Sequence, residues 1–557
     1  MIGTSLPEYI FIRTCIFLVQ YTTPLCTACL ALLAVSLGGL APALSHPLGM
    51  VLATYSVLDV IYAVFIYIPH NRRLKEEARH PPPLTREERS QLFRRCFANV
   101  PDARRYLQMW FLGADESEIR RDNLRDFILW AFFDRWPGNE SEDEEEELDG
   151  YVEAMENLLG RRLEPGRGKA EGLRLTLDEV ETRYRSIAWY FVVGVVDLVS
   201  HCQLARNGFH YYAQSPSKVL PVIPPRLQNL FTSRYSESEG LSYWYRPHTA
   251  TDKLPVVFLH GIGIGLYTYV PFLQRLNSES RGQDGQGQIG IIAIEMLPIS
   301  FRLTEAPLGR PEFLEQIATV LNAHGWDKFV LVSHSYGTAL ATHMLRSEKL
   351  FDRISSVVLV DPVTILLHLP DVAYNFTRRR PRWANEWQLW YFASMDPGVA
   401  HCLGRHFFWK DNIVWKEELL GIEGRGSSPA ELVGVDGGGG GGQGVRATAT
   451  TGRPQRRRVA VCLAERDLIV DTLMVAQYLS ADGEEGWVNT RSLTADNSGR
   501  DARPNKWSME QDEWGAGYLT RDGIELLWFW GLDHAQAFDT KKNQDRLCSV
   551  IRRYCAE

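Results

Sequence analysis

The strongest constraint on this chain lies near its amino terminus, where no Asp, Glu, Lys or Arg occurs between Arg13 and Asp59. A membrane-spanning helix needs about 20 apolar residues, so this stretch is long enough for one span and the start of another. A turn is expected at 44–47, because Pro47 cannot continue a helix. We therefore predict two transmembrane helices, from about Val19 to Leu40 and from about Leu48 to Ile68.

Two features near this segment bear on its interpretation. A cleaved signal peptide is the alternative, with Ala41-Pro-Ala43 as the cleavage site, but the apolar segment is too long for one and a second apolar segment follows. Asp59 lies inside the second predicted span. A carboxyl group there either serves a function or sits against the partner helix or near the interface, and we expect the second.

Basic residues follow the second apolar segment, in Pro69-His-Asn-Arg-Arg-Leu-Lys75. Since such flanks stay on the cytosolic side, we predict that residues 1–70 are a membrane anchor and that the rest of the chain faces the cytosol. With two spans the amino terminus would face the cytosol as well.

Composition excludes several classes of protein. The chain has 557 residues, more than one compact domain usually needs, and its formal net charge of -8 gives no reason to expect nucleic acid as a partner. The 9 cysteines are scattered, and no Cys/His cluster has zinc spacing. We expect no disulfide framework, no metal and no cofactor; the oligomeric state stays open.

Residues 71–216 are predicted to be a mainly helical cytosolic region. The acidic run at 141–149 is expected to be a solvated loop. The apolar segment from Ile187 to Val199 is short for a span and contains Asp197. We predict that it forms a buried helix or an amphipathic segment on the membrane surface.

From residue 217 to 557, short β-rich segments alternate with helical ones, which indicates a mostly parallel sheet in an α/β domain. The tracts 278–288, 424–458 and 481–514 are expected to be disordered, and the second holds a run of six glycines. The expected strands are 241–245, 256–259, 289–294, 329–332, 356–360, 459–463 and 525–529, and the expected helices are 311–323 and 336–346.

The segment Phe329-Val-Leu-Val-Ser-His-Ser335-Tyr-Gly-Thr carries the most specific chemistry. It resembles the nucleophile elbow G-x-S-x-G, a sharp turn between a strand and a helix that exposes a serine oxygen. Gly337 fits the pattern, and Ser333 replaces the usual first glycine with another small residue. Ser335 is therefore the candidate nucleophile.

Three further segments complete the pattern. His260-Gly-Ile-Gly resembles the oxyanion loop of lipases and esterases, with the N–H groups of Ile262 or Gly263 and of Tyr336 as candidate donors. We expect His260 itself to be structural. Asp467, after the strand at 459–463, is the candidate acid. His534, after the strand at 525–529, is the candidate base, in the order Ser, Asp, His.

On these four segments the chain is identified as a member of the α/β-hydrolase superfamily, of the AB hydrolase-1 type, and it resembles membrane-anchored fungal members. The resemblance implies an α/β-hydrolase fold with a mostly parallel sheet, and a helical lid within about 362–458. It also implies that Ser335, Asp467 and His534 hydrolyse a carboxylic ester through an acyl-enzyme. Some members place the acid one strand earlier, so Asp361 is the alternative; Asp471 and Glu465 are minor candidates.

The predicted lid is rich in large apolar side chains, as in Trp387-Gln-Leu-Trp-Tyr-Phe392. Together with the anchor, this points to a lipid-like ester as substrate. Two alternatives stay open. One is an acyltransferase on the same fold, because His534 and Asp539 have the H-x-x-x-x-D spacing. The other is an inactive membrane scaffold.

Overall fold

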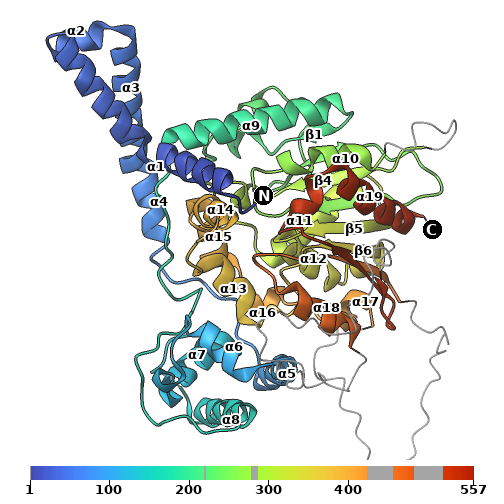
Figure 1. The fold of residues 1–557 in the computed structure, drawn as a ribbon. Helices are drawn as coiled ribbons and strands as arrows, with labels where there is room; N and C mark the ends of the chain where they lie inside the picture. Colours follow the sequence, from blue (N-terminus) through green and yellow to red (C-terminus); the bar gives the residue numbers. More distant parts are fainter. Residues whose placement is uncertain are drawn as a thin grey trace, which may run out of the picture.

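The computed structural model describes residues 2–138, 140–218, 221–277, 287–422, 456–481 and 518–556. The three tracts expected to be disordered, 278–288, 424–458 and 481–514, lie almost entirely outside the described residues. Figure 1 shows a helical hairpin, a small helical region and a sheet flanked by helices.

The hairpin projects from the rest of the molecule (Figure 1) and consists of α1 (Leu6–Ser36), α2 (Leu40–Ser45) and α3 (Pro47–Tyr62). A π-helical turn at Ala63–Tyr67 leads from α3 into α4 (Ile68–Arg73). The helices Leu6–Ser36 and Pro47–Arg73 are both long and apolar enough to cross a membrane. The predicted turn at 44–47 is confirmed only in part: α3 begins at Pro47 after an extended His46, but residues 44 and 45 belong to α2, and a second break lies at 37–39.

α1 differs from the prediction in its start and its shape. Ser5 and Glu8 form a capping box, so the helix begins at Leu6 instead of near Val19. Tyr21 has φ -109° and ψ 16°, which is not helical, and Pro24 follows within the helix. Proline removes a helical hydrogen bond and bends the chain. Only the part of α1 after this kink pairs with α3 in the projecting hairpin (Figure 1).

Asp59 joins the hairpin to the body of the protein, as expected for a structural role. It is buried, accepts a hydrogen bond from the hydroxyl of Thr23 on α1, and lies 2.9 Å from the hydroxyl of Tyr184. Its second oxygen accepts the N–H of Ile187 at 2.7 Å. The carboxylate therefore satisfies an N–H in the first turn of the next long helix, which has no partner within that helix.

That helix, α9 (Ile187–Arg206), has 20 residues, longer than the predicted 13-residue segment, and is also long and apolar enough to span a membrane. It lies along the sheet domain (Figure 1). Asp197 points into that domain and pairs with Arg302 at 3.0 Å and Arg226 at 3.4 Å. The opposite face exposes apolar side chains, which agrees with an amphipathic segment.

A helical region lies between α4 and α9 in the sequence and packs under the lid (Figure 1). The predicted acidic loop at 141–149 is wrong, because these residues begin α8. Ser141 and Glu144 form a capping box, acidic residues in a first turn interact favourably with the helix dipole, and Leu148, Val152 and Met155 are buried at helical spacing. The helices of this region are α5 (Arg86–Ala98), α6 (Ala103–Trp110), α7 (Arg121–Phe133) and α8 (Glu142–Leu159).

In the described part of the chain, nine strands form one sheet in the order β1-β2-β4-β3-β5-β6-β7-β9-β8. The strands from β4 through β3, β5, β6 and β7 to β9 are parallel, and β1, β2 and β8 run antiparallel to their neighbours. All seven predicted strands are confirmed. The bounds are β1 (His210–Tyr212), β2 (Ser242–Arg246), β3 (Val256–Leu259), β4 (Ile291–Glu295), β5 (Phe329–His334), β6 (Ile354–Val360), β7 (Arg458–Ala464), β8 (Tyr518–Leu519) and β9 (Ile524–Phe529). Since β1 belongs to the sheet, this domain begins before the predicted residue 217.

Helices cover both faces of the sheet, which explains the unbroken apolar runs of its central strands. On one face Phe258 and Val330 pack with residues of α10 (Val270–Arg275) and α19 (Lys541–Cys555). On the other, Val257 and Leu331 pack with residues of α11 (Arg310–Ala323), α12 (Gly337–Leu345) and α18 (Thr472–Ser480). The predicted helices 311–323 and 336–346 correspond to α11 and α12.

The lid lies between β6 and β7, as predicted. Its helices are α13 (Pro370–Thr377), α14 (Ala384–Gln388), a π-helix at Leu389–Ser394, α15 (Pro397–His406), α16 (Trp409–Asn412) and α17 (Lys416–Leu420). The helical region is bonded to this lid: Arg105 pairs with Asp371 at 2.5 Å, and the indole of Trp409 donates to the carbonyl of Ala131 at 3.0 Å. The helical region is therefore packed directly against the lid.

Candidate active site

Ser335 lies at the sharp turn between β5 and α12. Its φ is 50°, in the left-handed region that a non-glycine residue rarely adopts, and its N–H donates to the carbonyl of Val360 at 3.0 Å. A Cβ on Gly337 would stand 2.4 Å from the carbonyl oxygen of Leu259, so only glycine fits there. Ser333 is buried in β5, where a small side chain is accommodated. The predicted elbow geometry is present.

His534 connects Ser335 to Asp467. Its Nε2 lies 2.8 Å from Oγ of Ser335, and its Nδ1 lies 2.7 Å from Oδ2 of Asp467. The other oxygen of Asp467 accepts the N–H groups of Ile469 at 2.8 Å and Val470 at 2.9 Å, which fixes the carboxylate. Three loops, after β5, β7 and β9, thus bring the three predicted residues into one hydrogen-bonded chain.

The imidazole of His534 is strongly perturbed. Burial disfavours its charged form, but the neighbouring carboxylates, Asp467 foremost, outweigh burial and raise the pKa of His534 to about 9. Asp467 therefore stabilises an imidazolium at this position, which is the state a base reaches after it has taken a proton.

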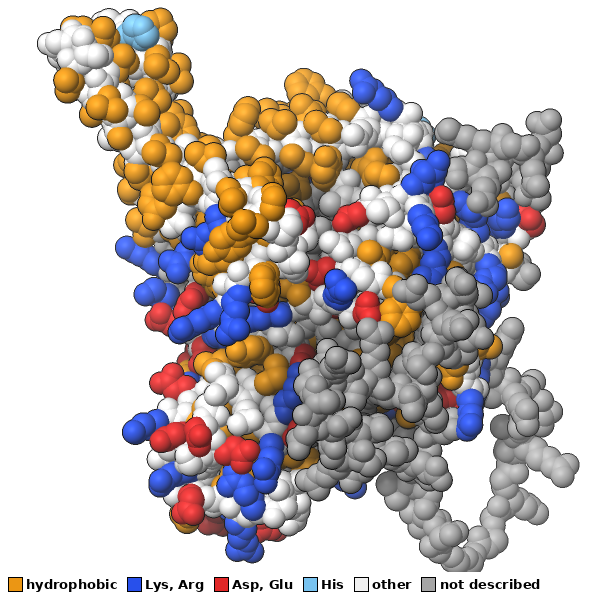
Figure 2. Space-filling model, in the orientation of Figure 1, with side chains coloured by type: hydrophobic (Ala, Val, Ile, Leu, Met, Phe, Trp, Pro, Cys, Tyr) orange, Lys and Arg blue, Asp and Glu red, His pale blue; other side chains and the backbone are white. Residues whose placement is uncertain are grey.

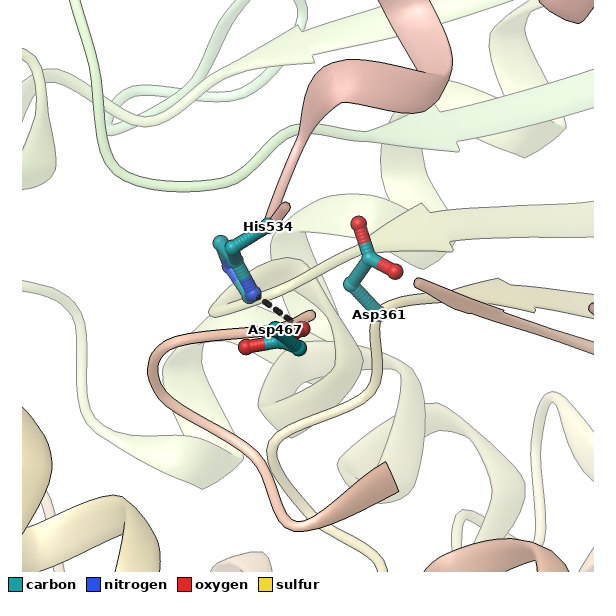
Figure 3. Close-up of side chains that lie close together, drawn as sticks. All are labelled: Asp361, Asp467 and His534. Atoms are coloured by element: carbon teal, nitrogen blue, oxygen red, sulfur yellow. Dashed lines mark hydrogen bonds and ion pairs between the residues drawn. The ribbon is translucent and has the colours of Figure 1, made fainter. Parts of the chain in front are cut away.

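Asp361, the alternative acid, lies close by but has other partners. Its oxygens accept the N–H of Ala464 at 3.2 Å and the N–H of Ala535 at 2.8 Å. Figure 3 shows His534 bonded to Asp467 and no such bond to Asp361. The geometry favours Asp467 as the acid and gives Asp361 a role in holding the loop that carries His534.

Asp361, Asp467 and His534 have potential ligand atoms within 4.8 Å of one another, the spacing of a metal site. Both ring nitrogens of His534 are engaged, with Ser335 and with Asp467. Each carboxylate also accepts backbone N–H groups. These donors fit a hydrogen-bonded triad better than a metal centre. Of the minor acid candidates, Asp471 caps α18 and Glu465 accepts the N–H of Gly531 at 2.8 Å.

The oxyanion loop follows β3. Gly263 donates its N–H to the carbonyl of Ile299 at 3.2 Å, whereas within the described residues the N–H groups of Ile262 and Tyr336 have no protein acceptor. This favours Ile262 over Gly263 as the partner of Tyr336. His260 is structural, as expected, because its Nε2 accepts the N–H of Met296 at 2.9 Å.

Sequence reasoning missed the residues behind the elbow. His334 is buried, with Nδ1 2.8 Å from the hydroxyl of Tyr269 and Nε2 3.7 Å from Asp361. Tyr269 in turn accepts the N–H of Gly261 at 3.1 Å. This network links the elbow to the oxyanion loop. The only sequence signal was a histidine directly before the predicted nucleophile.

Ser335, His534 and Tyr336 line a cavity of about 550 Å³. This lies in the usual range for small-molecule sites, about 300–1,000 Å³. Most of its wall is apolar and comes from the oxyanion loop, the lid, α9, the helical region and α1. Its lining includes Ile262, Phe301, Leu389, Phe392, Leu403, Phe407, Trp189, Trp110, Trp130, Phe11 and Ile12.

The two ring nitrogens of His534 bond Ser335 and Asp467, and the acyltransferase spacing instead joins His534 to Asp539. Asp539 also lines the cavity, but the Nδ1 atom of His534 is bonded to Asp467.

A sequence profile of the family described as alpha/beta hydrolase fold matches residues 255–403. Similar solved structures include a bacterial membrane phospholipase A, with 11% identity, a TM-score of 0.33, and 66% of this chain and 94% of that chain covered. Carboxylesterase CesB from Bacillus subtilis has 11% identity, a TM-score of 0.31 and coverages of 64% and 98%. A hyperthermophilic esterase from the archaeon Pyrobaculum calidifontis has 12% identity and a TM-score of 0.32, with 66% of this chain and 92% of that chain covered. No curated protein matches significantly.

Proposed function

Because the chain belongs, through residues 255–403, to the α/β-hydrolase fold family, we propose that it is a membrane-anchored serine hydrolase of carboxylic esters. The observation that carries this proposal is the hydrogen-bonded chain Ser335–His534–Asp467, which opens into an apolar cavity. The backbone donors Ile262 and Tyr336 lie at the same cavity.

In the proposed reaction, Oγ of Ser335 attacks the ester carbonyl while Nε2 of His534 takes its proton. Asp467 stabilises the imidazolium. The carbonyl oxygen becomes an oxyanion that accepts hydrogen bonds from the N–H groups of Ile262 and Tyr336. The intermediate collapses, the carbon–oxygen bond to the alcohol breaks, and His534 protonates the leaving alcohol. Water then cleaves the acyl-enzyme by the same steps in reverse, which releases the acid.

Two features support a lipid-like ester and a membrane location. The cavity wall is mostly apolar, so polar groups of a substrate would be poorly solvated there. Three described helices are long and apolar enough to span a membrane. Arg72 and Arg73 at the end of the second of them, and Lys75 just after it, favour a cytosolic catalytic domain.

The direct test is labelling of the full-length protein by a fluorophosphonate, which reacts with activated serines and needs no knowledge of the substrate. We expect labelling of the wild type, and none of Ser335→Ala. Ser333→Ala is the matched control: the hydroxyl of Ser333 has no hydrogen-bond partner within the described residues, so this variant keeps its label. A folded wild type without label would instead support an inactive scaffold.

A further inference from the structure

The part of α1 before the kink at Tyr21 leaves the hairpin and lies on the lid. Ile12 and Ile16 are buried there and pack with Ala384 and Tyr391. The guanidinium of Arg13 stands 3.8 Å over the ring of Trp387, an arrangement that is favourable for a cation. This segment of α1 is therefore docked on the protein, although the same helix continues into the hairpin.

The docked segment also reaches the cavity of Ser335. Phe11, Ile12 and Cys15 line that cavity together with Leu389 and Phe392 of the lid's π-helix. Irregular helical turns of this kind are frequent at functional sites. A helix that begins a membrane hairpin thus supplies part of the wall around the candidate nucleophile.

The outer surface of this wall is apolar as well. Phe11 is 61% exposed and also lines the cavity, so it stands at the boundary between the cavity and the outside. Ile10, Phe17 and Leu18 are exposed beside it. Figure 2 shows that hydrophobic side chains cover the hairpin and continue over this segment and α9. An exposed apolar surface of this extent marks contact with a membrane.

We propose that the acyl chain of a bilayer lipid ester reaches Ser335 from the membrane along the docked segment of α1, with Phe11 at the mouth of the path. This inference rests on the proposed function and adds to it the source of the substrate, a bilayer lipid, and the route of its acyl chain. An ester whose acyl part is long contacts this wall; an acetyl ester, which needs only the space next to Ser335, does not.

The test compares 4-methylumbelliferyl palmitate with 4-methylumbelliferyl acetate, using the full-length protein in phosphatidylcholine vesicles. In Phe11→Asp a charge stands at the mouth of the path. We expect kcat/KM for the palmitate to fall about tenfold or more, the range in which pocket contacts discriminate substrates, while the value for the acetate stays within about twofold.

Phe17→Asp is the matched control. Phe17 is 50% exposed on the same segment, and among the described residues it is not part of the cavity lining. Both variants add one charge to the same apolar surface, so a general loss of membrane contact would affect both.

A second pair of variants is Cys15→Trp and Cys29→Trp. The first narrows the cavity because Cys15 lines it, and the second does not because Cys29 is exposed on the hairpin.

The possible outcomes separate the two proposals. Without fluorophosphonate labelling of the wild type, the proposed function itself fails. The membrane route is overturned if Ser335 is labelled but the wild type does not hydrolyse the palmitate. It is also overturned if Phe11→Asp and Phe17→Asp lower kcat/KM for both esters to the same extent. A selective loss with the palmitate in Phe11→Asp and Cys15→Trp, and in neither control, supports it.

Discussion

His534 determines how activity should depend on pH. Only a neutral imidazole can take the proton of Ser335, and the pKa of His534 is raised to about 9, against burial, chiefly by Asp467. We therefore expect kcat/KM for a neutral ester to rise with pH and to reach half its plateau near pH 9. A profile with its midpoint near the ordinary histidine value, about 6.5, would contradict this assignment.

The raised pKa of His534 also makes the stability of the fold depend on pH. Since the folded-state pKa is above the unfolded value of about 6.5, the imidazolium–carboxylate pair stabilises the fold fully below that pH. This contribution is lost as the pH rises through about 9. Activity and this part of stability therefore change in opposite directions between these two values.

The two carboxylates near His534 can be distinguished by substitution. Asp467 bonds the ring, whereas Asp361 bonds the backbone N–H groups of Ala464 and Ala535. Loss of the orienting carboxylate costs about 10⁴-fold in kcat in a well-studied serine protease. We expect a loss of this order in Asp467→Asn and a midpoint of the pH profile below 9, because the main group that raises the pKa of His534 is gone.

In Asp361→Asn the amide oxygen can still accept one of the two backbone N–H groups, and the bond from His534 to Asp467 is retained. We expect a loss of about 10- to 100-fold, the size of effect that follows loss of a supporting partner in other sites. Steady-state kinetics of both variants with one short ester decide the matter: an equal or larger loss in Asp361→Asn would transfer the role of acid to Asp361.

α9 is long and apolar enough to span a bilayer, but its contacts with the domain favour a position on the membrane surface. One face is fixed to the domain through Asp197, Arg226 and Arg302. Removing that face from the protein would leave buried charges unpaired, at a cost of several kcal/mol. Phe191 and Leu198 project from the other face, 72% and 53% exposed. We expect α9 to lie flat on the membrane surface.

A depth measurement can show this. Phe191 and Leu198 are seven positions apart, about 10 Å along a helix. In a background with Cys29→Ser and Cys202→Ser, fluorophores attached at Phe191→Cys or Leu198→Cys should be quenched by shallow lipid quenchers to the same extent. A clear difference in depth between the two positions would show that α9 crosses the bilayer.

The elements show which structures could be predicted from the sequence. Strands such as β3 and β5 are buried on both faces, so they appear as short apolar runs between turn residues. β1 has only three residues, two of them half-buried, at the edge of the sheet, and gives no such run. The high charge of residues 141–149 predicted a solvated loop, whereas these residues begin α8. Its capping box and its buried Leu148 and Val152 outweigh that charge.

The site could be predicted to a similar degree. Ser335, Asp467 and His534 each follow a recognisable strand, and parallel strands bring their carboxyl ends to one edge of the sheet. The contribution of Phe11 and Cys15 to the cavity could not be predicted, because it depends on the bend at Tyr21 and on tertiary packing against the lid. His334 and Tyr269 were missed for the same reason: their bond joins the end of β5 to a short helical turn 65 residues away in the sequence.

For the molecule as a whole, the position of the amino terminus bears on topology. The N–H of Ile2 donates to the side chain of Gln388 in the lid at 2.9 Å. The amino terminus therefore lies against the catalytic domain (Figure 1). His70, after α3, lies 3.3 Å from the carbonyl of Pro397 in the same lid. We therefore propose that α1 and α3 form a hairpin whose two ends lie on one face of the bilayer.

This arrangement predicts the result of a protease-protection experiment. With an epitope at each end of the full-length protein in sealed microsomes, we expect both epitopes to be digested from the cytosolic side without detergent, because Arg72, Arg73 and Lys75 favour a cytosolic flank of the hairpin. Opposite protection of the two epitopes would mean an odd number of crossings. It would also be incompatible with the contact between Ile2 and Gln388, and with a docked α1 segment beside Ser335.

Replacing Arg72, Arg73 and Lys75 by glutamine should increase the protected fraction of both epitopes together, since the hairpin inverts as a unit.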